Sequence, residues 1–379
     1  MKKGIQAKLW DGKQFRNGWL TYSKGVIERV SFNRPSPSRA ATLHNLKDKC
    51  MLPGFVDTLL HGFAGVDCGA GTPARLHKMT VKLARTGVTT TLAGLYPATN
   101  KQLIQAAKNW DKWASIKGAR TRVAGWHVEG PFVSREMSGA LPKTGMRKPS
   151  IKAAQQFIDA CGGWLMMTTL APELDGALEA SEVLRRNNVI PSVGHSRATA
   201  LQCEMLRANG KIAVTHLGNR MLPMTARELG PIGLAMCGGI DYVAVIPDMV
   251  HVSADTLSMW ANTAKLKSRL MACSDNLSHA GTRAKKFQSG GQTLSRSGSV
   301  AINSQGNLGG TLDPLPELLL RAHRDGALSL QQVVSMGCQV AGDMLGDCGR
   351  LKAGRRADFV EYNESKKNIG QVWCKGRKV

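Results

Sequence analysis

Four polar residues each follow an apolar, strand-like run of this sequence, and their types suit chemistry at a metal ion. They are Glu129, His195, His216 and Asp275. One carboxylate and two imidazoles can hold a single divalent metal and leave a coordination position open for water. A further carboxylate nearby could then move protons. The pattern therefore indicates metal-dependent chemistry on a water molecule, provided that the fold brings the four residues together.

The middle of the chain alternates strand-like and helical stretches, which is the arrangement that could bring them together. Eight strand-helix units over about 230 residues fit a (β/α)₈ TIM-type barrel of the α/β class, with a doubly wound sheet as the alternative. Active residues of such barrels lie at the carboxyl ends of the strands, where all four residues fall. The expected strands lie near Met51–Asp57, Gly87–Leu92, Thr121–Val128, Leu165–Leu170, Val189–Gly194, Ile212–His216, Tyr242–Ile246 and Leu270–Ser274.

Helix start signals are clear at two places. Thr72 is a suitable N-cap with Pro73 at the first helical position. Ser196 is expected to open another helix, with Leu201 and Met205 on one apolar face and Gly210 at its end.

Both ends of the chain read as short strands and turns. Trp10–Lys13 is a hairpin-type turn, and apolar and polar residues alternate around Lys24-Gly25. The last 30 residues have the same character. We therefore expect residues 1–50 and 346–379 to build one small β-sandwich domain, with a barrel domain over residues 51–345 inserted between them.

One internal stretch, residues 282–299, is rich in Ser and Gly and poor in core residues. It is expected to be a mobile loop after the eighth strand, either a lid over the site or a surface insertion without a role.

The formal charge of +24 is the unusual feature of the composition. Lys and Arg are spread along the chain, and aromatic residues make up only 5%, so a dedicated nucleic-acid surface is not expected. The charge is compatible with an anionic small substrate, and a general basic bias explains it equally well.

Targeting and redox signals favour the cytoplasm. No apolar run is long enough to span a membrane, and Met1-Lys2-Lys3 is not followed by the apolar segment of a signal peptide. The nine cysteines are scattered and contain no C-x-x-C pair, so neither a disulfide framework nor a Cys-based zinc site is expected.

Motifs around these residues resemble the N-acetylglucosamine-6-phosphate deacetylases of the amidohydrolase superfamily, from about residue 50 to about residue 360. Nine pieces follow the family's order, and they are specific only as a set. They are Pro53–Asp57 with His61-Gly62, His127–Phe132, Leu170–Glu173, Val193–Ser196, Thr215–Met221, Arg227–Gly230, Asp248–His251, Ser274-Asp275 and Leu308–Thr311. The family's fold, a (β/α)₈ barrel with a small β-sandwich from both termini, agrees with the arrangement inferred above.

The resemblance implies a role for each matching position in the reaction. Glu129, His195 and His216 match the metal ligands, Asp275 the catalytic acid/base and His251 the histidine that orients the substrate. A bound metal would lower the pKa of water to roughly 7. Asp275 would accept the water's proton and pass a proton to the leaving amine. Zinc is the expected divalent ion, with iron or another divalent ion as alternatives.

Two further positions match the family's substrate contacts. Asn219 and Arg227 correspond to residues that recognise the substrate, chiefly its phosphate, and Arg227 would reach across a homodimer interface.

Several positions depart from the family pattern. Many members carry a second histidine where this chain has Leu59, so we expect one metal, with His61 in a supporting role. Leu141, Arg220, Met249 and Leu229 replace a histidine, a small residue, a glycine and a proline. Arg220 beside Asn219 could bind the phosphate or fill its pocket, and these two interpretations predict opposite effects of Arg220→Ala on affinity.

The function expected from the resemblance is deacetylation of an N-acetyl amino-sugar phosphate, with N-acetylglucosamine 6-phosphate as the first choice. The changed pocket residues leave open a related amidohydrolase that acts on an unphosphorylated or different N-acyl sugar or another amide. A non-catalytic sugar-phosphate-binding protein is the third alternative. A protein that only binds the sugar phosphate would not need an acid/base such as Asp275.

Overall fold

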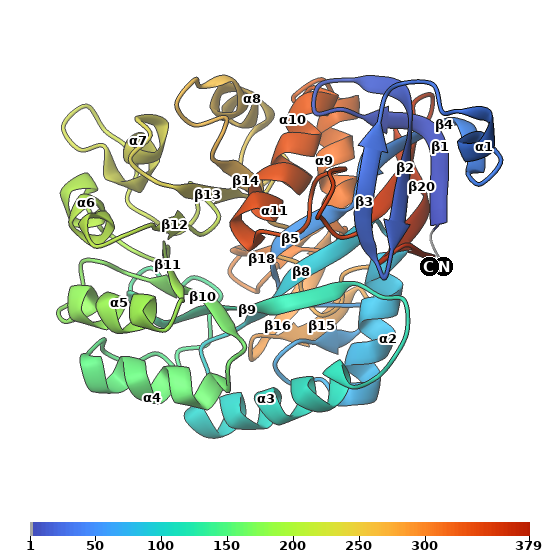
Figure 1. The fold of residues 1–379 in the computed structure, drawn as a ribbon. Helices are drawn as coiled ribbons and strands as arrows, with labels where there is room; N and C mark the ends of the chain where they lie inside the picture. Colours follow the sequence, from blue (N-terminus) through green and yellow to red (C-terminus); the bar gives the residue numbers. More distant parts are fainter. Residues whose placement is uncertain (1–2) are drawn as a thin grey trace.

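The computed structural model describes residues 3–379, which form a barrel and a smaller sheet domain (Figure 1). Eight strands, all paired in parallel, follow the order β14-β13-β12-β11-β10-β9-β8-β5 around the barrel. The expected (β/α)₈ fold is confirmed. The strands are β5 Phe55–Leu60, β8 Val88–Leu95, β9 Arg122–Phe132, β10 Leu165–Leu170, β11 Ile190–Val193, β12 Ala213–Val214, β13 Tyr242–Val245 and β14 Leu270–Ala272.

The barrel closes between its last and first strands near their carboxyl ends. Leu60 and Asn276 form an isolated parallel bridge. The backbone N–H of Asp275 donates to the Leu59 carbonyl over 2.9 Å, and that of His61 donates to the Asn276 carbonyl over 2.8 Å. This closure places Asp275 beside His61, although the two are more than 200 residues apart in the sequence.

Helices cover the outside of the barrel, with at least one after each strand. Thr72 caps the first of them by accepting a hydrogen bond from the Arg75 N–H, as predicted. The helices are α2 Pro73–Ala84, α3 Asn100–Ala114, α4 Ile151–Cys161, α5 Ala177–Arg186, α6 Ala200–Ala208, α7 Gly230–Met236 and α8 Ala254–Asn262, followed after β14 by α9 Leu315–Arg324, α10 Leu330–Val334, the π-helical turn η1 Ser335–Gln339 and α11 Val340–Leu345.

The predicted start of α6 at Ser196 is wrong. The helix begins at Ala200 with Thr199 as its N-cap, and the Ser196 hydroxyl donates instead to the Glu173 carboxylate over 2.6 Å. Leu201 and Met205, which we expected on one apolar face, lie on the outer side of the helix, because they are 64% and 47% exposed. The buried face of this helix is made by Cys203 and Leu206.

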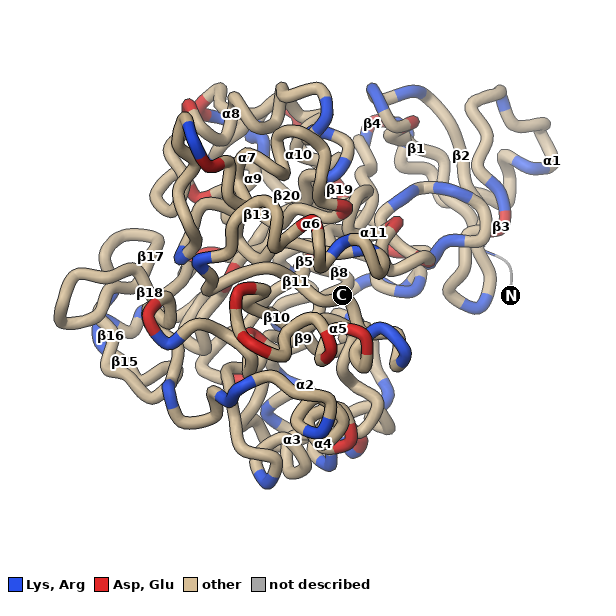
Figure 2. The backbone as a smooth tube through the Cα atoms, turned by 90° about the vertical axis from the view of Figure 1, so that its left-hand side faces the viewer, with Lys and Arg blue, Asp and Glu red and all other residues tan. Residues whose placement is uncertain are grey.

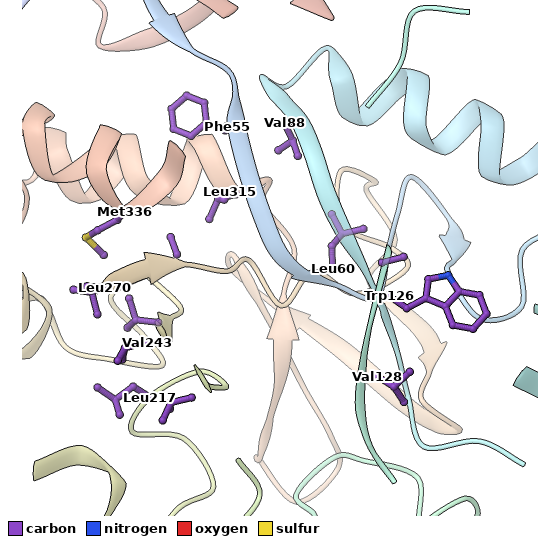
Figure 3. Close-up of a cluster of buried hydrophobic side chains, with 14 of the residues drawn as sticks. Phe55, Leu60, Val88, Trp126, Val128, Leu217, Val243, Leu270, Leu315 and Met336 are labelled. Carbon is purple, nitrogen blue, oxygen red and sulfur yellow. The ribbon is translucent and has the colours of Figure 1, made fainter. Parts of the chain in front are cut away.

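Apolar side chains fill two layers of the barrel, and Figure 3 shows part of the outer one. The outer layer packs strands against helices, with Phe55 and Val88 from strands and Leu315 and Met336 from the covering helices. The inner layer fills the barrel and includes Leu59, which is 1% exposed. Burial of each large side chain contributes roughly 1.5–3 kcal/mol to the stability of the fold. The core therefore holds the strand ends rigidly in place.

Both termini contribute to one seven-stranded sheet with the order β21-β20-β19-β4-β1-β2-β3, as expected for a small domain built from the two ends (Figure 1). The turns predicted at Trp10–Lys13 and Lys24-Gly25 connect its first three strands. Its elements are β1 Lys3–Trp10, β2 Phe15–Ser23, β3 Val26–Ser31, α1 Pro37–Ala40, β4 His44–Pro53, β19 Phe359–Asn363, β20 Asn368–Cys374 and β21 Arg377–Lys378.

The structure differs from the strand expected over Met51–Asp57. Residues up to Pro53 belong to β4 and pair with β19, so this strand of the terminal sheet runs three residues past the expected boundary at residue 50. The first barrel strand then begins at Phe55, because Pro53 and Gly54 interrupt the extended run.

The stretch at 282–299 is not the structureless loop that we expected. It contributes the first two strands of a four-stranded antiparallel sheet, which consists of β15 Lys286–Ser289, β16 Gln292–Ser297, β17 Val300–Ile302 and β18 Leu308–Thr311. Phe287 and Leu294 form the buried face of this sheet, which the composition of the segment did not indicate. A short hairpin, β6 Gly62–Phe63 and β7 Val66–Asp67, follows β5.

Within residues 3–379, no helix combines the length and apolar character needed to cross a membrane. All nine cysteines are free, and eight of them are buried.

Candidate active site

Three of the four predicted residues leave their strands through an unusual backbone conformation. His195, His216 and Asp275 have φ values of 49°, 34° and 51°, each within three residues of the end of a barrel strand. The left-handed region costs a residue with a β-carbon roughly 1–2 kcal/mol. Such strain is concentrated at functional sites, where the surrounding fold holds it in place. Here it occurs at three residues whose side chains converge, His195 and His216 on Glu129 and Asp275 on His61.

Glu129 lies at the centre of the cluster. Its Oε1 is 2.8 Å from His195 Nε2 and 2.7 Å from His216 Nε2, while its Oε2 is 2.9 Å from His61 Nε2. All four side chains are buried. Burial opposes the ionisation of Glu129, but the charge and hydrogen bonds of His195 and the hydrogen bonds of the other two imidazoles outweigh it and hold its pKa well below its usual range.

The donor atoms of Glu129, His195 and His216 fit a metal ion. His195 Nδ1 lies 2.8 Å from the Met137 carbonyl, which can only accept a hydrogen bond, so this nitrogen carries a proton. In the neutral imidazole, the Nε2 lone pair then faces the Glu129 carboxylate. Two lone pairs at this distance repel each other unless a proton or a metal cation lies between them. The three donor atoms lie within 4.8 Å of one another, and one carboxylate with two imidazoles is a common ligand set for a catalytic divalent metal.

His61 and Asp275 form a second group of donor atoms with the same Glu129. His61 Nε2 lies 3.2 Å from Asp275 Oδ1, and its ring stacks on Tyr96 at 4.0 Å. Burial opposes protonation of His61, but the hydrogen bonds to Asp275 and Glu129 raise its pKa to about 10. All three side chains line the cavity, and that of Asp275 is the most exposed of them, at 13%. Leu59 faces the barrel interior and adds no ligand.

His251 is fixed by a neighbouring carboxylate. Its Nδ1 donates to Asp248 Oδ2 over 2.6 Å, and the other Asp248 oxygen accepts the backbone N–H groups of Val250 and His251. This pairing leaves His251 Nε2 for the cavity. Met249 between them has a φ of 63°, which explains why glycine suits that position, since glycine adopts it without a steric penalty.

The structure separates the three predicted phosphate-binding residues. Asn219 and Arg220 line the same cavity as the metal ligands. The Asn219 amide donates to the His216 carbonyl over 3.2 Å, and Arg220 donates to Asn307 Oδ1 over 3.0 Å. Arg227 lies outside the cavity, on the exposed loop before α7.

Sequence reasoning missed several residues that shape the site. Tyr96 forms part of the cavity wall, and Met137 orients His195 through its carbonyl. Asp57 accepts the Ser274 N–H over 2.9 Å and so ties β5 to the chain just before Asp275, while burial raises the pKa of Asp57 to about 7. Asp57 and Asp248 both lie inside motifs that resemble the deacetylase family. Their place in these motifs is the sequence signal that could have identified them.

The cavity has a volume of about 320 Å³, which is suitable for a small metabolite. All of the predicted residues except Arg227 reach it. Its walls are His61, Tyr96, Glu129, Ala140, Leu141, His195, His216, Asn219, Arg220, Ile246, His251, Asp275 and Gly306–Gly309.

This geometry can be compared with known proteins. The model of the amidohydrolase family matches residues 50–379, which is most of the chain. The chain belongs to the amidohydrolase family. Members of this family generally bind a divalent metal and hydrolyse an amide, and the cluster around Glu129 is able to hold such an ion.

Curated relatives and solved structures confirm the narrower resemblance within the amidohydrolases. N-acetylglucosamine-6-phosphate deacetylase of Bacillus subtilis (strain 168) is 29% identical over 93% of this chain and 91% of its own length. N-acetylgalactosamine-6-phosphate deacetylase of Escherichia coli O157:H7 is 28% identical over 95% of both chains. A mutant of the Mycobacterium smegmatis N-acetyl-D-glucosamine-6-phosphate deacetylase, solved in complex with that compound, has a TM-score of 0.88, 27% identity and coverage of 100% of this chain and 99% of its own.

Proposed function

We propose that this amidohydrolase is a metal-dependent deacetylase of an N-acetyl amino-sugar phosphate, which it converts to acetate and an amino-sugar phosphate. One observation carries the proposal. Glu129, His195 and His216 present a metal-ligand set in the same cavity as a partly exposed carboxylate, Asp275. The names of the relatives supply the substrate class. N-acetylglucosamine 6-phosphate is the first candidate.

The residues divide the reaction between them. A divalent metal held by Glu129, His195 and His216 would lower the pKa of a bound water to roughly 7 and polarise the acetamide carbonyl. Asp275 accepts the proton of the attacking water and delivers a proton to the departing amine, which is otherwise too basic to leave. His251, oriented by Asp248, donates a hydrogen bond from Nε2 to the oxyanion that develops on the carbonyl oxygen.

One metal ion per chain is proposed, with zinc as the expected ion and iron or another divalent ion as alternatives. The second donor group, His61 with Glu129 and Asp275, shares its carboxylate with the first, and Leu59 gives it no further ligand. We therefore assign His61 to holding Glu129 and Asp275 in place rather than to ligating the metal.

Arg220 is proposed to bind the substrate's phosphate rather than merely fill its pocket. Its guanidinium lines the cavity and, among the described residues, contacts the neutral Asn307 rather than a carboxylate. Its charge is therefore available to an anion, and charge-assisted hydrogen bonds are the strong ones.

The test compares acetate release from N-acetylglucosamine 6-phosphate and from N-acetylglucosamine. We expect kcat/KM to be at least about 100-fold higher for the phosphorylated sugar, because loss of charged hydrogen bonds costs roughly 1.5–3 kcal/mol each. Arg220→Ala should raise KM about 10- to 100-fold for the phosphorylated sugar alone. An improved affinity in this variant would instead favour pocket filling.

Substrate configuration is tested in the same assay. The E. coli relative is named for the galacto compound at nearly the same identity, so N-acetylgalactosamine 6-phosphate is the second candidate. Equal rates with and without phosphate would contradict the phosphate part of the proposal and favour another N-acyl sugar.

A homodimer is also proposed, with Arg227 of one protomer completing the site of its partner. Arg227 is exposed and, in the single chain, does not line its own cavity. The neighbouring elements α6, α7 and α8 and their loops carry most of the exposed large apolar side chains, which is typical of a covered surface. These are Leu201, Met205, Met224, Leu229, Val250 and Met259.

Charges on this surface are expected to separate the dimer. The double variant Leu201→Asp/Met205→Asp should halve the mass measured by light scattering and reduce kcat/KM, because Arg227 would no longer reach a partner's site. Ile104→Asp is the matched control, since Ile104 is also 44% exposed but lies on α3. A monomeric wild-type protein, or a double variant that stays dimeric, would contradict this interface.

A further inference from the structure

A second cavity, of about 660 Å³, lies on the far side of the barrel from the candidate site. Three segments form most of its wall: the turn between β2 and β3, the turn between β20 and β21, and the chain from Lys117 to Val123 that enters β9. Strand β9 begins at this cavity and carries Glu129 near its other end. The cavity is thus separate from the active site and about twice its volume. We call it the basal cavity.

The basal cavity is strongly cationic. Eight of its twenty lining residues are Lys or Arg and none is Asp or Glu, whereas Lys and Arg make up 51 of 379 residues in the whole chain. Figure 2 shows blue Lys and Arg segments on the chain near the C-terminus, where part of this wall lies. The general basic composition therefore does not explain this concentration. The eight residues are Lys3, Lys24, Lys117, Arg120, Arg122, Arg356, Lys375 and Arg377.

Most of this charge is not neutralised by the protein itself. Arg122 pairs with Asp347 and Arg356 with Asp358. The other six have no carboxylate within ion-pair distance in the part of the chain that the structure describes. Arg120 is half-buried against the Trp113 ring at 4.5 Å, and burial lowers its pKa. A partly desolvated cation without a counter-charge is costly, and an anionic ligand would relieve that cost.

The wall is held in one shape before any ligand arrives. Lys24-Gly25 and Lys375-Gly376 both have positive φ at the two central positions, as in a tight hairpin turn. Ala357 connects these turns, because its N–H donates to the Gly25 carbonyl over 2.8 Å and its carbonyl accepts from the Gly376 N–H over 2.7 Å. Lys24 and Lys375 thus project from turns that are fixed to each other. Such preorganisation reduces the entropy lost on binding.

We propose that the basal cavity binds a small ligand that carries two or more linked phosphate groups. A single phosphate has at most two negative charges at neutral pH and would leave most of the six unpaired cations without a partner. A diphosphate or triphosphate chain can contact cations on all three wall segments. Both a nucleoside triphosphate and an inorganic polyphosphate have this chemistry. The proposal is independent of the reaction at the other end of the barrel.

Isothermal titration calorimetry with sodium tripolyphosphate, ATP and inorganic phosphate tests this proposal. Tripolyphosphate should bind with one site per chain and at least about tenfold more tightly than inorganic phosphate. ATP that binds like tripolyphosphate shows that the phosphate chain alone is recognised, and tighter ATP binding shows a contact to the nucleoside. Both outcomes support the site. Equal affinity for tripolyphosphate and inorganic phosphate would overturn it.

Charge-reversal variants locate the site. Lys24→Glu/Lys375→Glu should weaken tripolyphosphate binding at least about tenfold, while Lys265→Glu/Lys267→Glu, an equal change of charge at exposed positions after α8, should alter it less than about twofold. Arg220→Ala should bind tripolyphosphate like the wild-type protein, which excludes the active site as the binding place. Equal weakening by both double variants would overturn the proposal in favour of diffuse surface charge.

Discussion

Asp275→Asn is expected to keep its metal and lose turnover. The amide has the shape of the carboxylate but cannot accept the proton of the attacking water. General acid–base catalysis contributes about 10²- to 10⁴-fold, so kcat should fall by that amount with little change in KM. The metal should remain because Glu129, His195 and His216, the proposed ligands, are untouched. Metal analysis and acetate release on the same preparation measure both quantities.

The control for this variant removes a carboxylate elsewhere. Asp241 pairs with Arg207 near the surface and lies outside the cavity, so Asp241→Asn should leave kcat unchanged. Turnover close to that of the wild type in Asp275→Asn would refute the acid/base role. Loss of the metal would show that Asp275 is a ligand and that the second donor group is in use.

Glu129→Gln is expected to abolish both metal binding and activity. Glu129 supplies the only carboxylate of the proposed ligand set, and it alone contacts His61, His195 and His216 at once. A ligand that binds only the folded state stabilises it by about 4 kcal/mol at 1,000 times its Kd. The wild-type protein should therefore melt at a higher temperature with metal than after chelation, and the variant should show no such difference.

The metal-dependent shift in melting temperature can be measured without any turnover of substrate. Glu361→Gln is the matched control, because Glu361 pairs with Lys49 in the terminal sheet, away from the cavity. It should retain the metal-dependent shift in melting temperature. A Glu129→Gln protein that still gains stability from metal would place the ion elsewhere.

The cluster of candidate site residues could be predicted because its members obey a rule of barrel topology. Carboxyl ends of parallel strands converge, so polar residues that follow apolar runs meet even when they are far apart in sequence. The motifs around Glu129 and His195 supplied the roles that we propose for them. The contact between His61 and Asp275 was not predictable in this way. It depends on closure between β5 and β14 through Leu60 and Asn276, for which no local pattern exists.

Other features could not be predicted for a similar reason, because they depend on contacts between distant segments of the chain. Ser196 and Thr199 are both good N-cap residues, and only the bond from Ser196 to Glu173 decides between them. Leu201 and Met205 have helical spacing, but they face outward, which a single-chain pattern cannot distinguish from a core face. The basal cavity combines Lys24, Arg120 and Lys375, whose proximity follows from the terminal sheet packing against the barrel.

The central claim is metal-dependent deacetylation, and the most direct test is a metal titration of the chelated protein in the presence of N-acetylglucosamine 6-phosphate. Acetate and free amine should appear in equal amounts, and the rate should rise to a plateau at about one equivalent of divalent metal per chain. A plateau at two equivalents would contradict the single metal site. Metal-loaded protein that releases acetate from neither this compound nor its galacto isomer would contradict the proposed function itself.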